Sequence, residues 1–238
     1  MGVVFGNVRI GVLGGIGPEA TAYFYNKLIL GLQEKGLIKS NKDFPQLIIN
    51  SIPAPELIYE KITENNLIPY IKGLIELDNF KVNFIVMVCN TIHLYHKGLQ
   101  DIINTPILDL RGELKKKLIK EKIKSVFILG TMSTIKQGLY KFNGIKTFEP
   151  NKKDLNQLTK YIFSFNKGLE KQKQIRKVKK ICQKYLNDGV QTIILGCTEF
   201  AVMLDKEEMP KINTIDVLVD STINLYKNIK SKKKIFIT

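Results

Sequence analysis

The chain has 238 residues, of which 44% are hydrophobic and 25% are charged, as in an ordinary globular protein of one large or two small domains. No apolar run reaches the length of about 18 residues that a helical membrane span requires, so no membrane partner is expected. Lys and Arg outnumber Asp and Glu by 37 to 22, which gives a net charge of +15 and a Lys-rich surface.

Strands and helices are predicted to alternate along the chain. In the first half we expect a strand over 8–13, a helix over 18–36, a strand over 47–52, a helix over 67–79, a strand over 84–88, a short helix over 91–101, a strand over 106–109 and a helix over 111–122. In the second half we expect a strand over 125–129, a helix over 134–142, a short strand over 146–148, helices over 155–165 and 171–188, a strand over 192–195, a helix over 200–204, a strand over 212–215 and a helix over 219–229. Such alternation is typical of parallel sheets covered by helices on both faces.

The two halves contain similar motifs in the same order. Each has a Gly-containing turn after a strand, then a Cys turn after another strand, then a short strand with an Asp at or near its end. We therefore expect two similar α/β units, with the ligand site in the cleft between them.

Cys89 and Cys197 occupy matching places in these halves. Each follows a run of apolar, mostly β-branched residues that predicts a buried strand, and each precedes a Thr-containing turn that predicts the start of a helix. The field of a helix N-terminus can lower the pKa of a thiol from about 8.5 toward neutrality. A thiolate and a thiol on opposite sides would be the base and the acid needed to remove and replace a proton on opposite faces of a carbon. Buried structural cysteines are the alternative interpretation.

A Gly-rich turn, Gly14-Gly-Ile-Gly-Pro-Glu-Ala20, joins the first predicted strand to the first helix. It resembles a dinucleotide fingerprint, but the second strand ends in Asn50-Ser51-Ile52-Pro53, with no acidic residue to hold a ribose. We expect its backbone N–H groups to approach an anion such as a carboxylate, with a simple tight turn as the alternative.

The remaining Cys and His residues leave other chemistries open. Cys182 lies on an amphipathic helix, where we expect it to be part of the core. Cys89, His93 and His96 could form a zinc site, but no familiar ligand pattern is completed, and no metal is expected. A hydrolase with Cys89 as nucleophile and His93 as base would leave Cys197 unexplained. We expect His93 to form a hydrogen bond within the cleft.

Charge and cysteine count also bear on partners and location. The basic stretches 171–184 and 227–234 lack interleaved aromatic residues and match no nucleic-acid module, so no nucleic-acid partner is expected. The positive charge could instead attract anionic substrates. Three Cys residues, an odd number, without an evident secretory signal favour a reducing cytoplasm over a disulfide framework.

Three motifs are informative together: Leu13-Gly-Gly-Ile-Gly-Pro-Glu-Ala-Thr21, Cys89-Asn-Thr-Ile-His93 and Gly196-Cys-Thr-Glu199. In order and spacing they resemble the aspartate/glutamate racemase family over essentially the whole chain. Within that family they resemble the aspartate racemase branch, because Glu199 stands where glutamate racemases typically have His. The Thr-rich turn Leu129-Gly-Thr-Met-Ser-Thr134 is also similar to one in the family.

The resemblance implies a fold, an activity and a set of site residues. The fold is two pseudo-symmetric Rossmann-like (flavodoxin-like) α/β domains with parallel sheets, formed by residues 1–111 plus 216–238 and by residues 112–215, with the active site in the interdomain cleft. The activity is that of an isomerase, a cofactor-independent racemase of L- and D-aspartate with Cys89 and Cys197 as its two bases. The implied substrate-binding residues are Gly15, Ile16, Asn90, Thr91, Thr131, Lys167, Thr198 and Glu199. The implied partners are a small amino-acid substrate and a second copy of the chain in a homodimer.

One departure from the family pattern concerns the substrate. Aspartate racemases commonly have an Arg, thought to meet a substrate carboxylate, where this chain has Pro55. Losing an Arg removes a bidentate partner for a carboxylate. Lys167 matches a second basic position and could hold that carboxylate alone. The alternatives are a racemase of glutamate or a less acidic amino acid, a related isomerase or decarboxylase, and a non-catalytic binding protein.

Overall fold

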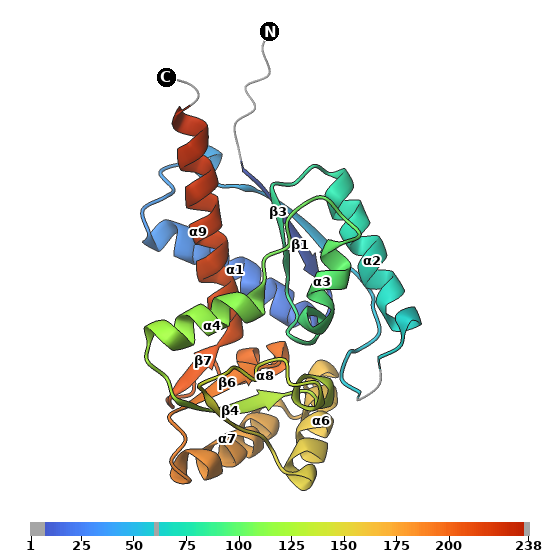
Figure 1. The fold of residues 1–238 in the computed structure, drawn as a ribbon, viewed down its shortest axis with the longest axis vertical. Coiled ribbons are helices and arrows are strands. Elements are labelled where there is room, and N and C mark those ends of the chain that lie inside the picture. Colours follow the sequence, from blue (N-terminus) through green and yellow to red (C-terminus); the bar gives the residue numbers. More distant parts are fainter. Residues whose placement is uncertain (1–7, 60–61, 236–238) are drawn as a thin grey trace.

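Two parallel β-sheets with flanking helices make up the described part of the chain, residues 8–59 and 62–235 of this computed structural model (Figure 1). The first sheet has the order β2-β1-β3, with β1 at Arg9–Gly14, β2 at Gln46–Ser51 and β3 at Phe84–Met87. The second has the order β5-β4-β6-β7, with β4 at Ser125–Gly130, β5 at Lys146–Phe148, β6 at Thr192–Gly196 and β7 at Lys211–Asn213. Each half thus has its first strand between its second and third, which confirms the predicted α/β fold of two similar units.

The central strands are apolar because helices cover both faces of each sheet. All residues of β3 and β6 are buried, as are the last five of β1 and of β4. Parallel sheets shielded in this way have nearly continuous apolar strands rather than alternating ones. The apolar runs before Cys89 and Cys197 therefore predicted the two strands that present these residues.

Helices connect the strands in both halves. The first half contains α1 (Pro18–Glu34), the 3₁₀ turn η1 (Asn41–Asp43), α2 (Glu64–Asn79), the 3₁₀ helix η2 (Thr91–Tyr95), α3 (His96–Gln100) and α4 (Leu110–Lys120). The second contains α5 (Met132–Lys136), α6 (Lys152–Asn166), α7 (Lys171–Asn187) and α8 (Thr198–Met203). The last helix, α9 (Thr214–Ile235), leaves the second sheet and packs against α1 and α4 (Figure 1). The predicted domain boundaries, near residues 111 and 216, remain a prediction.

Two expected elements differ from the structure in the middle of the chain. The strand expected over 106–109 is a single parallel bridge between Ile85 and Ile107. The helix expected over 134–142 lies at Met132–Lys136 instead. It ends early because Gly138 adopts a left-handed conformation, with φ of 65°, and the next amide returns to the carbonyl of Thr134.

The boundary between the last strand and the last helix also differs. Residues 212–215 were expected to be a strand, but β7 ends at Asn213 and α9 starts at Thr214, five residues earlier than expected. The side chain of Asn213 accepts a hydrogen bond of 2.9 Å from the backbone N–H of Ile215 and so satisfies a donor of the first turn. An N-terminal cap, rather than hydrophobic periodicity, sets this boundary.

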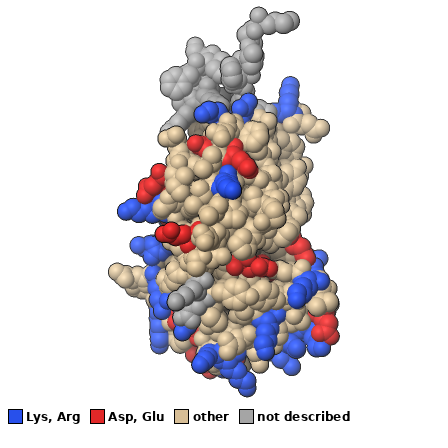
Figure 2. Space-filling view, turned by 90° about the vertical axis from the view of Figure 1, so that its right-hand side faces the viewer, with Lys and Arg blue, Asp and Glu red and all other residues tan. Residues whose placement is uncertain are grey.

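Basic side chains lie mainly on the outer surface. On the face in Figure 2, Lys and Arg gather over the lower half, where α6 and α7 lie in Figure 1. Among residues 8–59 and 62–235, no helix combines the length and apolarity needed to cross a membrane.

Candidate active site

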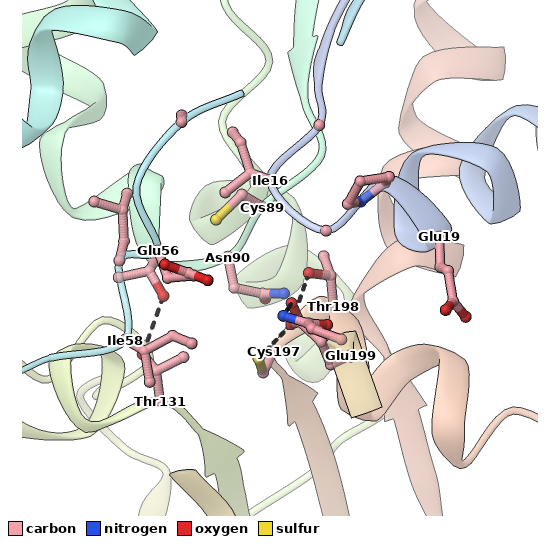
Figure 3. Close-up of a pocket in the computed structure, with 17 residues that line it drawn as sticks. Ile16, Glu19, Glu56, Ile58, Cys89, Asn90, Thr131, Cys197, Thr198 and Glu199 are labelled. Carbon is pink, nitrogen blue, oxygen red and sulfur yellow. Dashed lines mark hydrogen bonds between the residues drawn. The ribbon is translucent and has the colours of Figure 1, made fainter. Parts of the chain in front are cut away.

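A cavity of about 330 Å³ lies where the carboxyl ends of the strands of both sheets meet (Figure 3). This volume is at the lower end of the range for small-molecule sites, about 300–1,000 Å³. Nine of the ten residues named from the sequence line it, namely Gly15, Ile16, Cys89, Asn90, Thr91, Thr131, Cys197, Thr198 and Glu199. The structure therefore brings both Cys turns to one cavity.

Cys89 lies in the first turn after β3 and is almost fully buried. The pKa of its thiol is raised to about 12, mainly by burial and in part by the negative charge of Glu199. The backbone N–H groups of Ile92 and Thr91, at the start of η2, act in the opposite direction. The expectation that a helix N-terminus lowers this pKa overall is wrong, because loss of solvation outweighs these two donors.

Cys197 lies directly after β6, at the residue that precedes the first turn of α8. Its thiol donates a hydrogen bond of 2.8 Å to Oε2 of Glu199, two residues further along the chain. Burial raises the pKa of this thiol well above its usual value, and the charge and hydrogen bond of Glu199 raise it further. Here too the predicted lowering is wrong. The short contact nevertheless gives the Cys197 proton a direct route to a carboxylate.

Glu199 is itself buried and accepts hydrogen bonds from three side chains. Besides the thiol of Cys197, the hydroxyl of Thr198 donates at 3.2 Å and the amide of Asn166 at 3.3 Å. Asn166 was not predicted from the sequence. It is the last residue of α6 and directly precedes Lys167, the residue that was named instead.

Asn90 presents an unpaired donor to the cavity. The side chain is 1% exposed, and its Oδ1 accepts a hydrogen bond from the hydroxyl of Tyr140. Its Nδ2 has no hydrogen-bond partner among the described residues. A buried donor left unpaired costs about 1–3 kcal/mol, so this amide is suited to an acceptor supplied by a ligand, such as a carboxylate oxygen.

Threonine hydroxyl groups join the two halves beside the thiols. Oγ1 of Thr91, in η2, lies 3.0 Å from that of Thr131 and 3.2 Å from that of Thr134. Thr131 also caps α5 by accepting a hydrogen bond of 3.1 Å from the backbone N–H of Thr134. These contacts fix η2 of the first half against α5 of the second.

The Gly-rich turn supports the site differently from the expectation. The backbone N–H of Gly15 donates to the side chain of Thr21 at 3.0 Å, so this group is not available to an anion. Gly17 has a φ of 87°, and a Cβ atom there would lie 3.1 Å from Oε1 of Glu199. The glycine therefore allows the backbone of the first half to approach the carboxylate of the second.

Lys167, the tenth predicted residue, does not line the cavity. It caps the end of α6, and its side chain is exposed. The segment around Pro55 does line the cavity, through Ala54 and the three residues from Glu56 to Ile58. The carbonyl of Pro55 accepts a hydrogen bond from Tyr70. The carboxylates of Glu19 and Glu56 also line the cavity and were not named from the sequence: Glu19 lies within the Gly-rich motif, whereas Glu56 belongs to no motif.

The other Cys and His residues lie away from this cavity. Cys182 is buried in α7, as predicted for a core residue. His93 is buried, its ring is stacked on that of His96, and its Nε2 lies 3.4 Å from the carbonyl oxygen of Met87. It does not line the cavity, so the expected hydrogen bond within the cleft is not formed. Burial lowers the pKa of His93 to about 4, and the neighbouring His96 acts in the same direction. Residues 8–59 and 62–235 contain no group of three or more His, Cys, Asp or Glu placed to hold a metal ion.

Two thiols lie at matching strand ends, and one of them donates a hydrogen bond to a carboxylate. Such a site is suited to proton transfer on opposite sides of a small molecule. The chain belongs to the Asp/Glu/hydantoin racemase family, whose family model matches residues 13–222.

Individual relatives agree with this assignment. The broad-specificity amino-acid racemase RacX of Bacillus subtilis is 27% identical over 224 residues, which cover 91% of this chain and 97% of the relative. A glutamate racemase of Sulfurihydrogenibium is 32% identical over 174 residues, or 67% of this chain and 65% of that protein.

A solved structure shares the fold over nearly the full length. The aspartate racemase of Picrophilus torridus superposes with a TM-score of 0.79 at 22% identity, covering 93% of this chain and 95% of that one. The sequence relatives thus include glutamate and broad-specificity racemases, and the structural neighbours include an aspartate racemase.

Proposed function

We propose that this chain is a cofactor-independent amino-acid racemase in which Cys89 and Cys197 are the opposed acid and base. The observation that carries the proposal is that both thiols line one cavity from matching strand ends of the two sheets. The family and the relatives support a racemase as the class of enzyme.

The proposed reaction moves two protons. A thiolate on one face takes the α-proton, so that the C–H bond breaks and an S–H bond forms. The thiol on the other face then gives its proton to the carbon, and the opposite enantiomer results. Glu199, which accepts the hydrogen bond of Cys197, takes the proton of this thiol when Cys197 is the base.

Binding groups around the thiols complete the proposal. The free Nδ2 of Asn90 holds the α-carboxylate of the substrate and stabilises the charge that develops when the α-proton leaves. The deepest part of the cavity is shielded from solvent, since both thiols and Asn90 are buried, and such shielding strengthens the electrostatic contacts made there.

The proposal also concerns which amino acid is the substrate. Aspartate, the substrate that the resemblance implied, has a second carboxylate that needs a cationic partner. No Lys or Arg of the described residues lines the cavity, and Lys167 lies outside it. The homodimer and the cytoplasmic location remain predictions, and light scattering coupled to size-exclusion chromatography tests the first.

The test is proton NMR of the purified protein in D₂O with acidic, neutral and basic L-amino acids in turn. A racemase exchanges the α-proton for deuterium, and the D-enantiomer appears on chiral chromatography. Exchange without inversion would favour a related isomerase. If no amino acid exchanged its α-proton while both thiols were reduced, the result would contradict the proposal and favour a binding protein.

A further inference from the structure

The cavity is acidic although the protein is strongly basic. The chain has a net charge of +15, yet the described charged residues that line the cavity are Glu19, Glu56 and Glu199. Basic side chains gather instead on the outside, over the lower half of the face in Figure 2. The net charge of the residues that line the cavity is therefore opposite in sign to the net charge of the whole chain.

Two of these carboxylates already have partners. Glu19 lies at the rim and forms an ion pair of 2.5 Å with Lys171. Glu199 accepts hydrogen bonds from Cys197, Thr198 and Asn166. Neither carboxylate needs a substrate to satisfy it.

Glu56 differs from both. Its carboxylate points toward the middle of the cavity, on the side of Cys89 (Figure 3). No hydrogen bond or ion pair joins it to another described residue. A substrate with a side-chain carboxylate would meet a like charge at this position, without a described cation to offset it.

The wall beside Glu56 is apolar. Leu57 and Ile58, the next residues along the chain, and Ile16 from the opposite loop are all buried and line the cavity. An apolar wall that ends in a carboxylate suits a side chain with a methylene stem and a cationic head.

We propose that the substrate of this site is an amino acid with a cationic side chain, an ammonium or a guanidinium, and that Glu56 determines this specificity by accepting its hydrogen bonds. This inference rests on the proposed racemase function and names the substrate class. Lysine, ornithine and arginine have the required chemistry.

The experiment compares lysine, aspartate and methionine in two assays. The first measures kcat/KM for racemisation, and the second measures binding by isothermal titration calorimetry, which does not depend on turnover. The informative variant is Glu56→Gln, which keeps the shape and removes the charge. Glu19→Gln is the matched control, because it removes a carboxylate of the same cavity that is already paired with Lys171.

The expected result is that lysine is preferred to both other amino acids. Glu56→Gln should lower its kcat/KM and its affinity by about 10- to 100-fold, the usual effect of losing a hydrogen bond between charged groups. The same variant should leave methionine unchanged, and Glu19→Gln should leave lysine within about threefold of the wild type.

Two outcomes would overturn the inference. One is that aspartate binds more tightly than lysine, and the other is that lysine binds equally well to Glu56→Gln and to the wild type. If lysine binds through Glu56 but no amino acid exchanges its α-proton, the racemase proposal fails and the ligand preference stands.

Discussion

Cys89 and Cys197 occupy equivalent places after β3 and β6, yet their surroundings differ. Two residues after Cys197 stands Glu199, whose carboxylate accepts the thiol hydrogen bond, whereas two residues after Cys89 stands Thr91, whose hydroxyl contacts Thr131 instead. The repeated fold presents both thiols from similar strand ends, but among the described residues only Cys197 has a carboxylate as hydrogen-bond partner. A two-base reaction on this scaffold therefore uses different proton routes on its two faces.

The largest expected effect comes from removing either thiol. Cys89→Ala and Cys197→Ala should each lower racemisation at least about 10³-fold, within the range for losing a positioned acid or base. Any residual α-proton exchange should be confined to one enantiomer, and to opposite enantiomers in the two variants. Chiral chromatography and NMR in D₂O measure both quantities. Cys182→Ala, the same change in the core of α7, is the control, and full activity in either site variant would refute the two-base mechanism.

The difference between the second residues after each Cys predicts an unequal effect. Glu199→Gln should lower kcat about 10²-fold, because Cys197 loses the acceptor of its proton. Thr91→Val, at the matching position, removes hydroxyl contacts to Thr131 and Thr134 that stabilise the packing of the two halves but accept no proton from a thiol, so kcat should fall less than in Glu199→Gln, by no more than about tenfold. Equal losses in steady-state assays of the two variants would mean that the halves are chemically equivalent after all.

The residues directly after each Cys provide a third comparison. Asn90→Ala removes the unpaired amide donor and should raise KM by about 10- to 100-fold, as expected for a hydrogen bond to a carboxylate. Thr198→Ala removes a hydroxyl that already donates to Glu199, so a smaller change in KM is expected. The assignment of Asn90 to the substrate would be wrong if Thr198→Ala raised KM more.

The smallest expected effect concerns stability in alkali. The pKa of Cys89 is about 12 in the folded chain and about 9 when exposed. At a pH between these two values, unfolding therefore releases the proton of this thiol. Its contribution to stability is complete below pH 9 and should be lost at about 1.4 kcal/mol per pH unit above it. Urea unfolding at pH 8, 9 and 10 should show a shallower decline for Cys89→Ala than for the wild type. Identical slopes would mean that folding does not raise the pKa of this thiol.

The sequence predicted what depends on local pattern. Apolar runs before Cys89 and Cys197 placed both residues at strand ends, and parallel strands bring such ends to one edge of a sheet. It could not predict what depends on the course of a connecting segment. The carboxylate of Glu56 and the amide of Asn166 reach the cavity through tertiary packing, without a local motif. The raised thiol pKa values were missed for the same reason, because burial is a property of the folded chain.

The unpaired amide of Asn90 has a consequence for how the sequence can change over time. The free energy of unfolding of a protein is only about 5–15 kcal/mol, and an unpaired buried donor such as Nδ2 of Asn90 lowers it by about 1–3 kcal/mol. Selection for stability alone would remove this unpaired amide. The amide is therefore retained only while it binds a ligand. A descendant of this chain that lost its activity should lose Asn90 together with the buried hydroxyl of Tyr140, which donates to Asn90, and its melting temperature should then rise rather than fall.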